Sequence, residues 1–577
     1  MQRRTLLALT TALLSTTLSS GALIGTSSSA NAAIACTALA GTLAGSPGVK
    51  SATSTNSGLT YCKVSILYGT SADQNINIVV GLPLNSLDGG TGGSTEGAWN
   101  GRTQGLGGGG CTGNLSVTAA TNTGYVGSGT DGGHPGGDCE PAVNLDGTYN
   151  FRFLDDWTRV GLKQEILFSK LLANTYYGKA PVYNYWNGCS TGGRQGYLLA
   201  QELGNELDGV LADAPAINWT RFQTAQMWGQ IAMKDLVGGP IPAAKLSQTS
   251  ASAVAACDAA DGVADGIIDD PRTCTFSAKA NICGAPTAPA TNCLTAAEAA
   301  AIDKIWDGPR NLDSGNKIWF GLDRGTNLSG LNGTNPFGLG VTQFHWDEHD
   351  RNFDWHTVTM NGYAQVAQDG TTNPVLPGLS LAEETDTVGN LDDFKKHGGK
   401  LITYVGANDQ LIMPRGVINY YRQMAARYGI NSNVPGIPNV PNFANVQSFY
   451  RLFRAPGVAH CGLGNGSPDS FFAKLVAWVE QGTPPDQIIE TLPTKPTAST
   501  RPLCPYPQAA IWNKTGSPPY TASDFHCGGN LEVSTTVCPD VLIKEGHEAS
   551  SGQLDFTDTG VNRNICGLAG KSADAGK

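Results

Sequence analysis

Short apolar runs alternate with longer amphipathic segments through the middle of the chain. Residues 157–178 carry apolar positions at helical spacing, which predicts an amphipathic helix. The run APVYNYWNG (180–188) has the length and composition of a buried strand. A second helix is predicted over 192–204, and a second strand and loop over 207–216. Strands that alternate with helices are typical of a mostly parallel sheet.

This alternation is interrupted once and then resumes. Residues 217–390 are rich in Gly, Asn, Asp and Trp with only scattered helical patches, which indicates a large insertion. Strand and helix patterns return at 398–412, 413–429, 446–464 and 470–482. We therefore expect a leader (1–32), a first part of the core (33–216), an inserted lid (217–390), a second part of the core (391–500) and a C-terminal tail (501–577).

The first 32 residues have the pattern of a secretory leader. Arg3 and Arg4 precede an apolar run, and Ala30-Asn31-Ala32 is a small-x-small cleavage site, so cleavage is expected after Ala32. A membrane anchor and a twin-arginine signal are the alternatives. No later run of 18 apolar residues exists. We therefore expect a secreted or periplasmic protein with no membrane partner.

Composition narrows the class of protein further. Only 15% of residues are charged, whereas 40% are hydrophobic and 11 are Trp, so the chain is not disordered. The formal net charge of −11 opposes binding to nucleic acid or to an anionic membrane. Neutral or aromatic small molecules are the more plausible substrates.

The 14 cysteines are an even number in a chain that is expected to be exported, so disulfides are predicted. No C-x-x-C pair exists, which argues against a zinc ribbon or a thioredoxin-like site. Closeness in sequence predicts the pairs Cys36–Cys62, Cys111–Cys139, Cys257–Cys274, Cys283–Cys293, Cys504–Cys527 and Cys538–Cys566. Cys189 and Cys461 remain.

Ser190 is the candidate nucleophile. It lies in GCSTG (188–192), a G-x-S-x-G pattern that follows a predicted strand and precedes a predicted helix, as a nucleophile elbow requires. The flanking glycines permit a tight turn. The alternative is a structural serine in a loop.

A nucleophilic serine needs a base and an acid that orients the base, and in this fold they follow in the order Ser, Asp or Glu, His. His460 follows a late strand, whereas His397 precedes one and would lie at the wrong end of the sheet. Asp409 comes directly after the strand LITYVGAN. We therefore predict the triad Ser190–Asp409–His460; the other histidines considered lie in the tail and the insertion.

The neighbours of this triad carry two further predictions. An oxyanion hole needs two backbone N–H donors, one from Thr191 and one from the glycine-rich run 105–110, at Gly109 or Gly110. That run could instead be a flexible linker. Because Ser190 and His460 must approach each other, Cys189 and Cys461 should be close enough for a disulfide. The alternative is that these two cysteines are free or differently paired.

The insertion contains an acidic loop, CDAADGVADGIIDDPRTC (257–274). Asp258, Asp261 and Asp265 recur among glycines between two cysteines, which suits a calcium ion with oxygen ligands. The spacing is not that of an EF-hand. We expect a structural calcium ion, with a solvated acidic loop as the alternative.

Several of these motifs occur together in one known family. GCSTGGRQG, GANDQLI, PGVAHCGLG, CDAADGVADGIIDD, RPLCPYP and TDGGH resemble the tannase/feruloyl esterase family of α/β-hydrolases, over nearly the whole chain to about residue 530. The resemblance implies an α/β-hydrolase fold with a large lid between nucleophile and acid, and a disulfide between Cys189 and Cys461. It also implies calcium ligands in the lid: the carboxylates of Asp258, Asp261 and Asp265 and the carbonyls of Val263 and Ile267.

The family cleaves esters of aromatic acids, so the resemblance implies a serine esterase for feruloyl and other hydroxycinnamoyl esters. Galloyl esters and mono(2-hydroxyethyl) terephthalate are the alternative substrates, and residues 341–357 resemble the feruloyl esterase pattern more than the terephthalate one. Four lid aromatics could line the substrate pocket or form the core of the lid: Phe344, Trp346, Phe353 and Trp355. A non-catalytic binding protein, an acyl transferase and a peptidase are the other functions considered.

Overall fold

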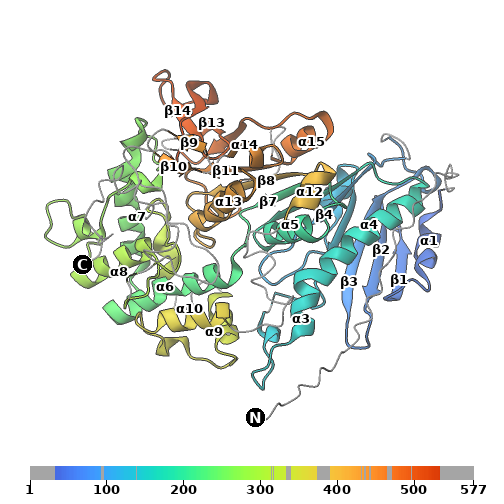
Figure 1. Ribbon diagram of the computed structural model, residues 1–577, viewed down its shortest axis with the longest axis horizontal. Coiled ribbons are helices and arrows are strands. Elements are labelled where there is room, and N and C mark those ends of the chain that lie inside the picture. Colours follow the sequence, from blue (N-terminus) through green and yellow to red (C-terminus); the bar gives the residue numbers. More distant parts are fainter. Residues whose placement is uncertain are drawn as a thin grey trace, which may run out of the picture.

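A nine-stranded mixed sheet forms the centre of the protein, a computed structural model shown in Figure 1. Its strand order is β1-β2-β3-β5-β4-β6-β7-β8-β11. The pairs among β1, β2, β3 and β5 are antiparallel, and all pairs from β5 to β11 are parallel. The strands are β1 (Val49–Thr55), β2 (Tyr61–Tyr68), β3 (Ile76–Pro83), β4 (Arg102–Leu106), β5 (Val126–Thr130), β6 (Tyr183–Cys189), β7 (Gly209–Asp213), β8 (Lys400–Gly406) and β11 (Tyr450–Ala455).

The structure describes most of the chain between residues 33 and 532. The described ranges are 33–92, 97–137, 139–313, 315, 317–332, 339–372, 390–429, 432–434, 437–440, 443–463, 471–494 and 497–532. The predicted leader (1–32) and the predicted Cys538–Cys566 bond lie outside these ranges.

Side chains on the parallel strands alternate between the two faces of the sheet, as the period of two requires. Tyr185 on β6 packs into one apolar layer with Ile402 on β8, whereas the next residue, Trp186, packs into the opposite layer with Leu401. Helices cover both layers, so the parallel part of the sheet is buried on both faces, whereas β1 keeps exposed side chains. The core helices are α1 (Cys36–Leu39), α2 (Thr118–Asn122), α3 (Phe151–Asp155), α4 (Gly161–Tyr177), α5 (Thr191–Glu202), α12 (Asp392–His397), α13 (Pro414–Tyr428), α14 (Phe443–Gln447) and α15 (Phe471–Gln481).

The chain leaves the sheet after Asp213 and returns to it at Lys400, and the intervening lid forms a separate group of helices (green and yellow in Figure 1). The lid helices are α6 (Trp219–Val237), α7 (Ala243–Cys257), α8 (Ala296–Asp307), α9 (Leu339–Asp347) and α10 (Tyr363–Thr372). They bury an apolar cluster of their own that includes Met227, Phe344 and Tyr363. The lid is therefore a packed group of helices inserted between β7 and β8.

The C-terminal segment returns to the core in short hairpins. Strand β12 (Ile488–Leu492) pairs with β13 (Ser499–Leu503), and β14 (Ala509–Trp512) pairs with β15 (Phe525–Gly528). A further small hairpin joins β9 (Ser432–Val434) to β10 (Ile437–Val440). None of the helices in the described ranges is both long and apolar enough to span a bilayer.

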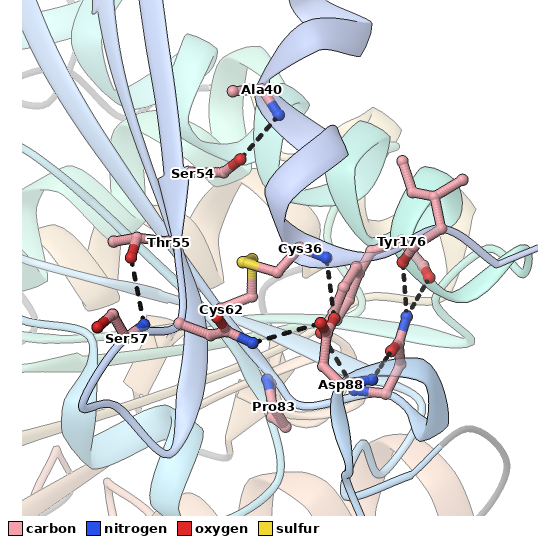
Figure 2. The surroundings of a disulfide bond; sticks show 12 residues. Cys36, Ala40, Ser54, Thr55, Ser57, Cys62, Pro83, Asp88 and Tyr176 are labelled. Atoms are coloured by element: carbon pink, nitrogen blue, oxygen red, sulfur yellow. Dashed lines mark hydrogen bonds between the residues drawn. A yellow bond between two sulfur atoms is a disulfide. The ribbon is translucent and has the colours of Figure 1, made fainter.

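Six disulfides join all the described cysteines, in the pairings expected from the sequence. Figure 2 shows the first of them, Cys36–Cys62, which ties α1 to β2. Beside it, the Asp88 carboxylate accepts hydrogen bonds from the Cys36 N–H (2.9 Å) and the Tyr176 hydroxyl (2.7 Å). This disulfide lies at the edge of the sheet remote from β8 and β11.

Candidate active site

The parallel strands bring the predicted site residues to one edge of the sheet. Strand β4 leads to Gly110, β6 to Ser190, β8 to Asp409 and β11 to His460, and each loop follows the carboxyl end of its strand. This edge is where α/β sheets place their ligands. Segments up to 350 residues apart in the sequence therefore meet because their strands are parallel neighbours in the sheet.

Ser190 lies in a strained turn between β6 and α5. Its φ of 63° and ψ of −125° fall outside the regions that ordinary residues prefer. Two hydrogen bonds hold this conformation, from the Ser190 N–H to the Asp213 carbonyl (3.0 Å) and from the Ala216 N–H to the Ser190 carbonyl (3.0 Å). A Cβ atom on Gly188 would lie 2.5 Å from the carbonyl carbon of Gly192, so only glycine permits this close approach. The turn has the form of a nucleophile elbow.

Asp409 and His460 form a tightly bonded pair. His460 Nδ1 lies 2.7 Å from Asp409 Oδ2, and the other carboxylate oxygen accepts the N–H groups of Leu411 and Ile412, both at 2.8 Å. The Asp409 side chain is 2% exposed and that of His460 is 10% exposed. An ionised carboxylate at Nδ1 holds the proton there and leaves Nε2 as the basic nitrogen. This is the arrangement that a general base needs.

A disulfide holds the loops of Ser190 and His460 together. The Cα atoms of Cys189 and Cys461 are 6.1 Å apart, and Cys461 has a φ of 50°. Within the described part of the chain, the Ser190 hydroxyl makes no hydrogen bond, so its contact with the imidazole is not formed in this structure. Catalytic hydrogen bonds often tighten only when substrate binds.

The backbone amides at this edge distinguish Gly110 from Gly109. The N–H groups of residues 107, 108 and 109 bond to the Asn187 carbonyl (3.0 Å), the Gln195 side chain (3.0 Å) and the Thr112 carbonyl (3.1 Å), respectively. Among the described residues, the N–H groups of Gly110 and Thr191 have no acceptor. The Thr191 hydroxyl bonds to the Gly110 carbonyl at 2.7 Å and fixes the two loops relative to each other. These two amides can serve as a pair of oxyanion donors, which favours Gly110 over Gly109.

A second carboxyl group near the serine does not compete as the acid. Asp213 ends β7, is 2% exposed, and bonds to Ser190 only through its backbone carbonyl. Burial, and then the nearby Glu490, raises the pKa of Asp213 well above its usual range. Burial therefore disfavours the charged form of Asp213, which makes it a poor partner for an imidazolium.

Several carboxylates lie close together in the acidic lid loop, but some of their oxygens already accept hydrogen bonds from backbone N–H groups or from an arginine. Asp258 accepts the N–H groups of Asp265 and Gly266 at 3.0 Å, and Arg501 binds Asp265 at 2.6 Å. Burial, and then the neighbouring Asp269, raises the pKa of Asp261 to about 8. No group of three or more acidic, His or Cys side chains in the described ranges is already arranged around a metal ion. One oxygen, Asp265 Oδ1, is buried with no hydrogen-bond partner among the described residues, which suits a cation ligand.

The four lid aromatics lie in the protein interior. Phe344, Trp346 and Trp355 are 0%, 3% and 6% exposed, and Phe353 packs against the lid cluster. The Trp346 indole N–H bonds to the Cys139 carbonyl at 3.2 Å. Of the two alternatives, a role in the core is the one that this packing supports.

Sequence reasoning missed two polar residues that support the site. Gln195 fixes the Gly108 amide in the oxyanion loop, and Gln410 accepts the His460 N–H at 3.2 Å. Gln195 lies in the motif around Ser190 and Gln410 directly follows Asp409. Their position beside predicted catalytic residues is the signal that could have identified them.

A serine elbow and an Asp–His pair on the carboxyl edge of such a sheet are typical of the α/β-hydrolase class, and the comparisons with known proteins agree. Residues 95–528 match the family model described as tannase and feruloyl esterase. The chain belongs to this family and is a carboxylic-ester hydrolase.

Three relatives illustrate the extent of the similarity. A probable feruloyl esterase of Arthroderma benhamiae is 33% identical over 464 residues, which cover 74% of this chain and 80% of the relative. The mono(2-hydroxyethyl) terephthalate hydrolase of Piscinibacter sakaiensis is 28% identical over 512 residues, covering 74% and 79%. The crystal structure of feruloyl esterase B from Aspergillus oryzae matches with a TM-score of 0.65 at 25% identity, covering 81% of this chain and 90% of that one.

Proposed function

We propose that this chain hydrolyses esters of hydroxycinnamic and other phenolic acids, in the manner of a feruloyl esterase, through an acyl-enzyme on Ser190. The observation that carries the proposal is the convergence of Ser190, the Asp409–His460 pair and the backbone amides of Gly110 and Thr191 on one sheet edge. The relatives named feruloyl esterase support the aromatic acid as the acyl group.

In the first half-reaction the Ser190 hydroxyl attacks the ester carbonyl. His460 Nε2 accepts the hydroxyl proton as the Oγ–C bond forms, and a positioned base of this kind contributes about 10²- to 10⁴-fold. The same proton then passes to the leaving alcohol, and the acyl group stays on Oγ. Asp409 keeps the second imidazole proton on Nδ1 throughout and stabilises the transient imidazolium.

In the second half-reaction a water molecule replaces the alcohol. His460 accepts a proton from the water as the water oxygen attacks the acyl carbon. Return of that proton to Ser190 Oγ releases the free acid and restores the hydroxyl. In both halves the carbonyl oxygen becomes negatively charged, and the N–H groups of Gly110 and Thr191 stabilise it; one such donor is worth about 10²- to 10³-fold in kcat.

The aspartate loop is proposed to bind a structural calcium ion. The carboxylates of Asp258, Asp261 and Asp265 and the carbonyls of Val263 and Ile267 would supply its ligands. The buried, unpartnered Oδ1 of Asp265 supports this assignment. The ion would neutralise the crowded carboxylates and order the lid; it would take no part in ester cleavage.

Export is the other proposed property. A set of six structural disulfides is typical of an oxidising compartment, and the N-terminal 32 residues have the pattern of a secretory leader. We therefore propose that the protein acts outside the cytosol on small ester substrates.

The test is the activity of a Ser190→Ala variant on four esters: methyl ferulate, methyl gallate, chlorogenate and mono(2-hydroxyethyl) terephthalate. The wild-type protein should prefer a hydroxycinnamoyl ester, and the variant should lose activity on all of them. Ser57→Ala is the control, because Ser57 is an exposed serine in the turn between β1 and β2. Retained activity in Ser190→Ala would overturn the mechanism, whereas a preference for the galloyl or terephthalate ester would replace only the substrate.

A further inference from the structure

The first turn of lid helix α9 lies against the oxyanion loop. A Cβ atom built on Gly110 would lie 3.8 Å from Leu339 Cδ1, and no other described atom beyond its chain neighbours would come within 4 Å. Leu339 is the first residue of α9 and is half-buried. An apolar methyl group of the lid is thus the group that faces the glycine whose amide is the proposed oxyanion donor.

Helix α9 also contacts the segment that begins at Cys139, which a disulfide joins to the oxyanion loop. Glu140 accepts a hydrogen bond from the Thr342 hydroxyl at 3.0 Å, and both of its oxygens lie 3.0 Å from His345 Nδ1. Glu140 follows Cys139, which is disulfide-bonded to Cys111, the residue after Gly110. Helix α9 is therefore connected to the oxyanion loop in two ways. Leu339 contacts the loop directly at Gly110, and Glu140 is joined to it through the Cys111–Cys139 disulfide.

Further hydrogen bonds continue this contact along the lid. The Tyr149 hydroxyl donates to the Trp346 carbonyl at 3.0 Å, and His349 Nδ1 lies 3.1 Å from the Gly147 carbonyl. Side chains of α9 and of residues 140–149 both take part in these bonds, and together they set the position of α9. Loss of the Glu140 bonds should therefore shift Leu339 relative to Gly110.

The strand order indicates which part of a substrate meets Leu339. Ser190 follows β6, and the loops of Gly110 and His460 come from strands on opposite sides of β6, β4 on one side and β11 on the other. The leaving alcohol receives its proton from His460 and so departs on the β11 side. The carbonyl oxygen points to the amides of Gly110 and Thr191, so the carbonyl carbon and the acyl group attached to it lie beside Gly110, which Leu339 faces.

We propose that Leu339 is a specificity-determining residue for the acyl group and that Glu140 is a positioning residue that holds α9 in place. The proposal rests on the proposed ester hydrolysis at Ser190. An apolar side chain at this position favours a flat aromatic acyl group, and a larger side chain there excludes it while a small acyl group still fits.

The test compares methyl ferulate and methyl cinnamate with methyl acetate in Leu339→Phe and Leu339→Ala. Leu339→Phe should lower kcat/KM for the two aromatic esters by about 10- to 200-fold, the range that small changes in an apolar pocket produce. It should lower kcat/KM for methyl acetate much less than for the two aromatic esters, since the acetyl group is the smaller acyl group. Leu339→Ala should narrow the preference for aromatic over acetyl esters. An equal change for all three esters in both variants would overturn the proposal.

A second pair of variants tests the positioning role of Glu140. Glu140→Ala should raise KM for methyl ferulate and leave kcat for methyl acetate unchanged, and Glu140→Gln, which keeps an oxygen acceptor, should restore most of the affinity. Asp354→Ala is the matched control, because it removes another carboxylate–His pair of the lid, Asp354–His356, in which both side chains are exposed. A parallel loss of kcat for both esters in Glu140→Ala, or no change, would refute the positioning role.

Different results would overturn the proposed ester hydrolysis and the proposed role of Leu339. If the wild-type protein hydrolyses none of these esters, or if Ser190→Ala remains active, the proposed function is wrong. If the wild-type protein hydrolyses them but replacing methyl ferulate by ethyl ferulate changes the effect of Leu339→Phe, the side chain contacts the alcohol, and the assignment to the acyl group is wrong.

Discussion

Removal of the Cys189–Cys461 disulfide should affect stability and catalysis at the same time. The bond joins residues 272 apart, and the chain-entropy relation gives an upper value of about 5–6 kcal/mol for a loop of this length. The bond also maintains two strained residues, Ser190 (φ 63°) and Cys461 (φ 50°), each of which costs about 1–3 kcal/mol. In a Cys189→Ala, Cys461→Ala double variant these residues can relax away from each other.

The expected loss of activity follows from geometry. A misplacement of about 1 Å between reacting groups costs on the order of 10²-fold in rate, so kcat should fall by about that factor while the protein is still folded. The assay is hydrolysis of p-nitrophenyl acetate at a temperature well below the transition, with the free energy of unfolding measured by urea denaturation on the same samples.

The Cys36→Ala, Cys62→Ala variant is the control. Its disulfide spans 26 residues at the far edge of the sheet (α1 and β2 in Figure 1), so the same relation gives about 3.5 kcal/mol, with no effect on kcat. Full kcat in the Cys189/Cys461 variant would refute the reasoning, as would an equal loss of kcat in the control.

Three further predictions concern the acid, a buried glutamate and the calcium loop. Asp409→Asn should lower kcat for p-nitrophenyl acetate by about 10⁴-fold, because an amide does not hold the required imidazole tautomer; a loss below about ten-fold would point to another acid. Burial raises the pKa of Glu165 to about 8 from an ordinary 4.5, so the folded state keeps its proton and stability should fall as pH rises from about 4.5 to about 8. The free energy of unfolding, measured by urea denaturation, should fall by about 4 kcal/mol from pH 5 to pH 8, and Glu165→Gln should remove this fall. The same pH dependence in the variant would contradict the assignment. Calcium at about 100 times its Kd should add about 2.7 kcal/mol of stability, so EGTA should lower Tm in the wild-type protein but not in Asp258→Asn; equal Tm values with and without EGTA in the wild-type protein would argue against the ion.

The parts of the fold that the sequence predicts well depend on local patterns. The strand, elbow and helix around Ser190 are encoded within about 25 consecutive residues, and Asp409 and His460 each follow an unmistakable apolar strand. Because carboxyl ends of parallel strands meet at one edge, the local pattern also predicts which loops come together. The disulfides between cysteines that are close in sequence are likewise predictable from short stretches of the chain.

The remaining features depend on contacts between distant segments. The choice of Gly110 over Gly109 requires knowing that Thr112 accepts the Gly109 N–H. The pairing of Asp265 with Arg501 joins residues 236 apart, and that of Glu140 with His345 joins residues 205 apart. No periodicity in the lid indicates whether an aromatic side chain points inward, because a helix buried on several sides shows no polar face.

Covalent trapping of the nucleophile tests the central claim most directly. A fluorophosphonate should react once per protein molecule, abolish ester hydrolysis, and add its mass to the tryptic peptide 180–194 at Ser190, with no labelling of Ser190→Ala. Stoichiometric labelling at another residue, or full ester hydrolysis by a protein whose Ser190 is labelled, would contradict the account.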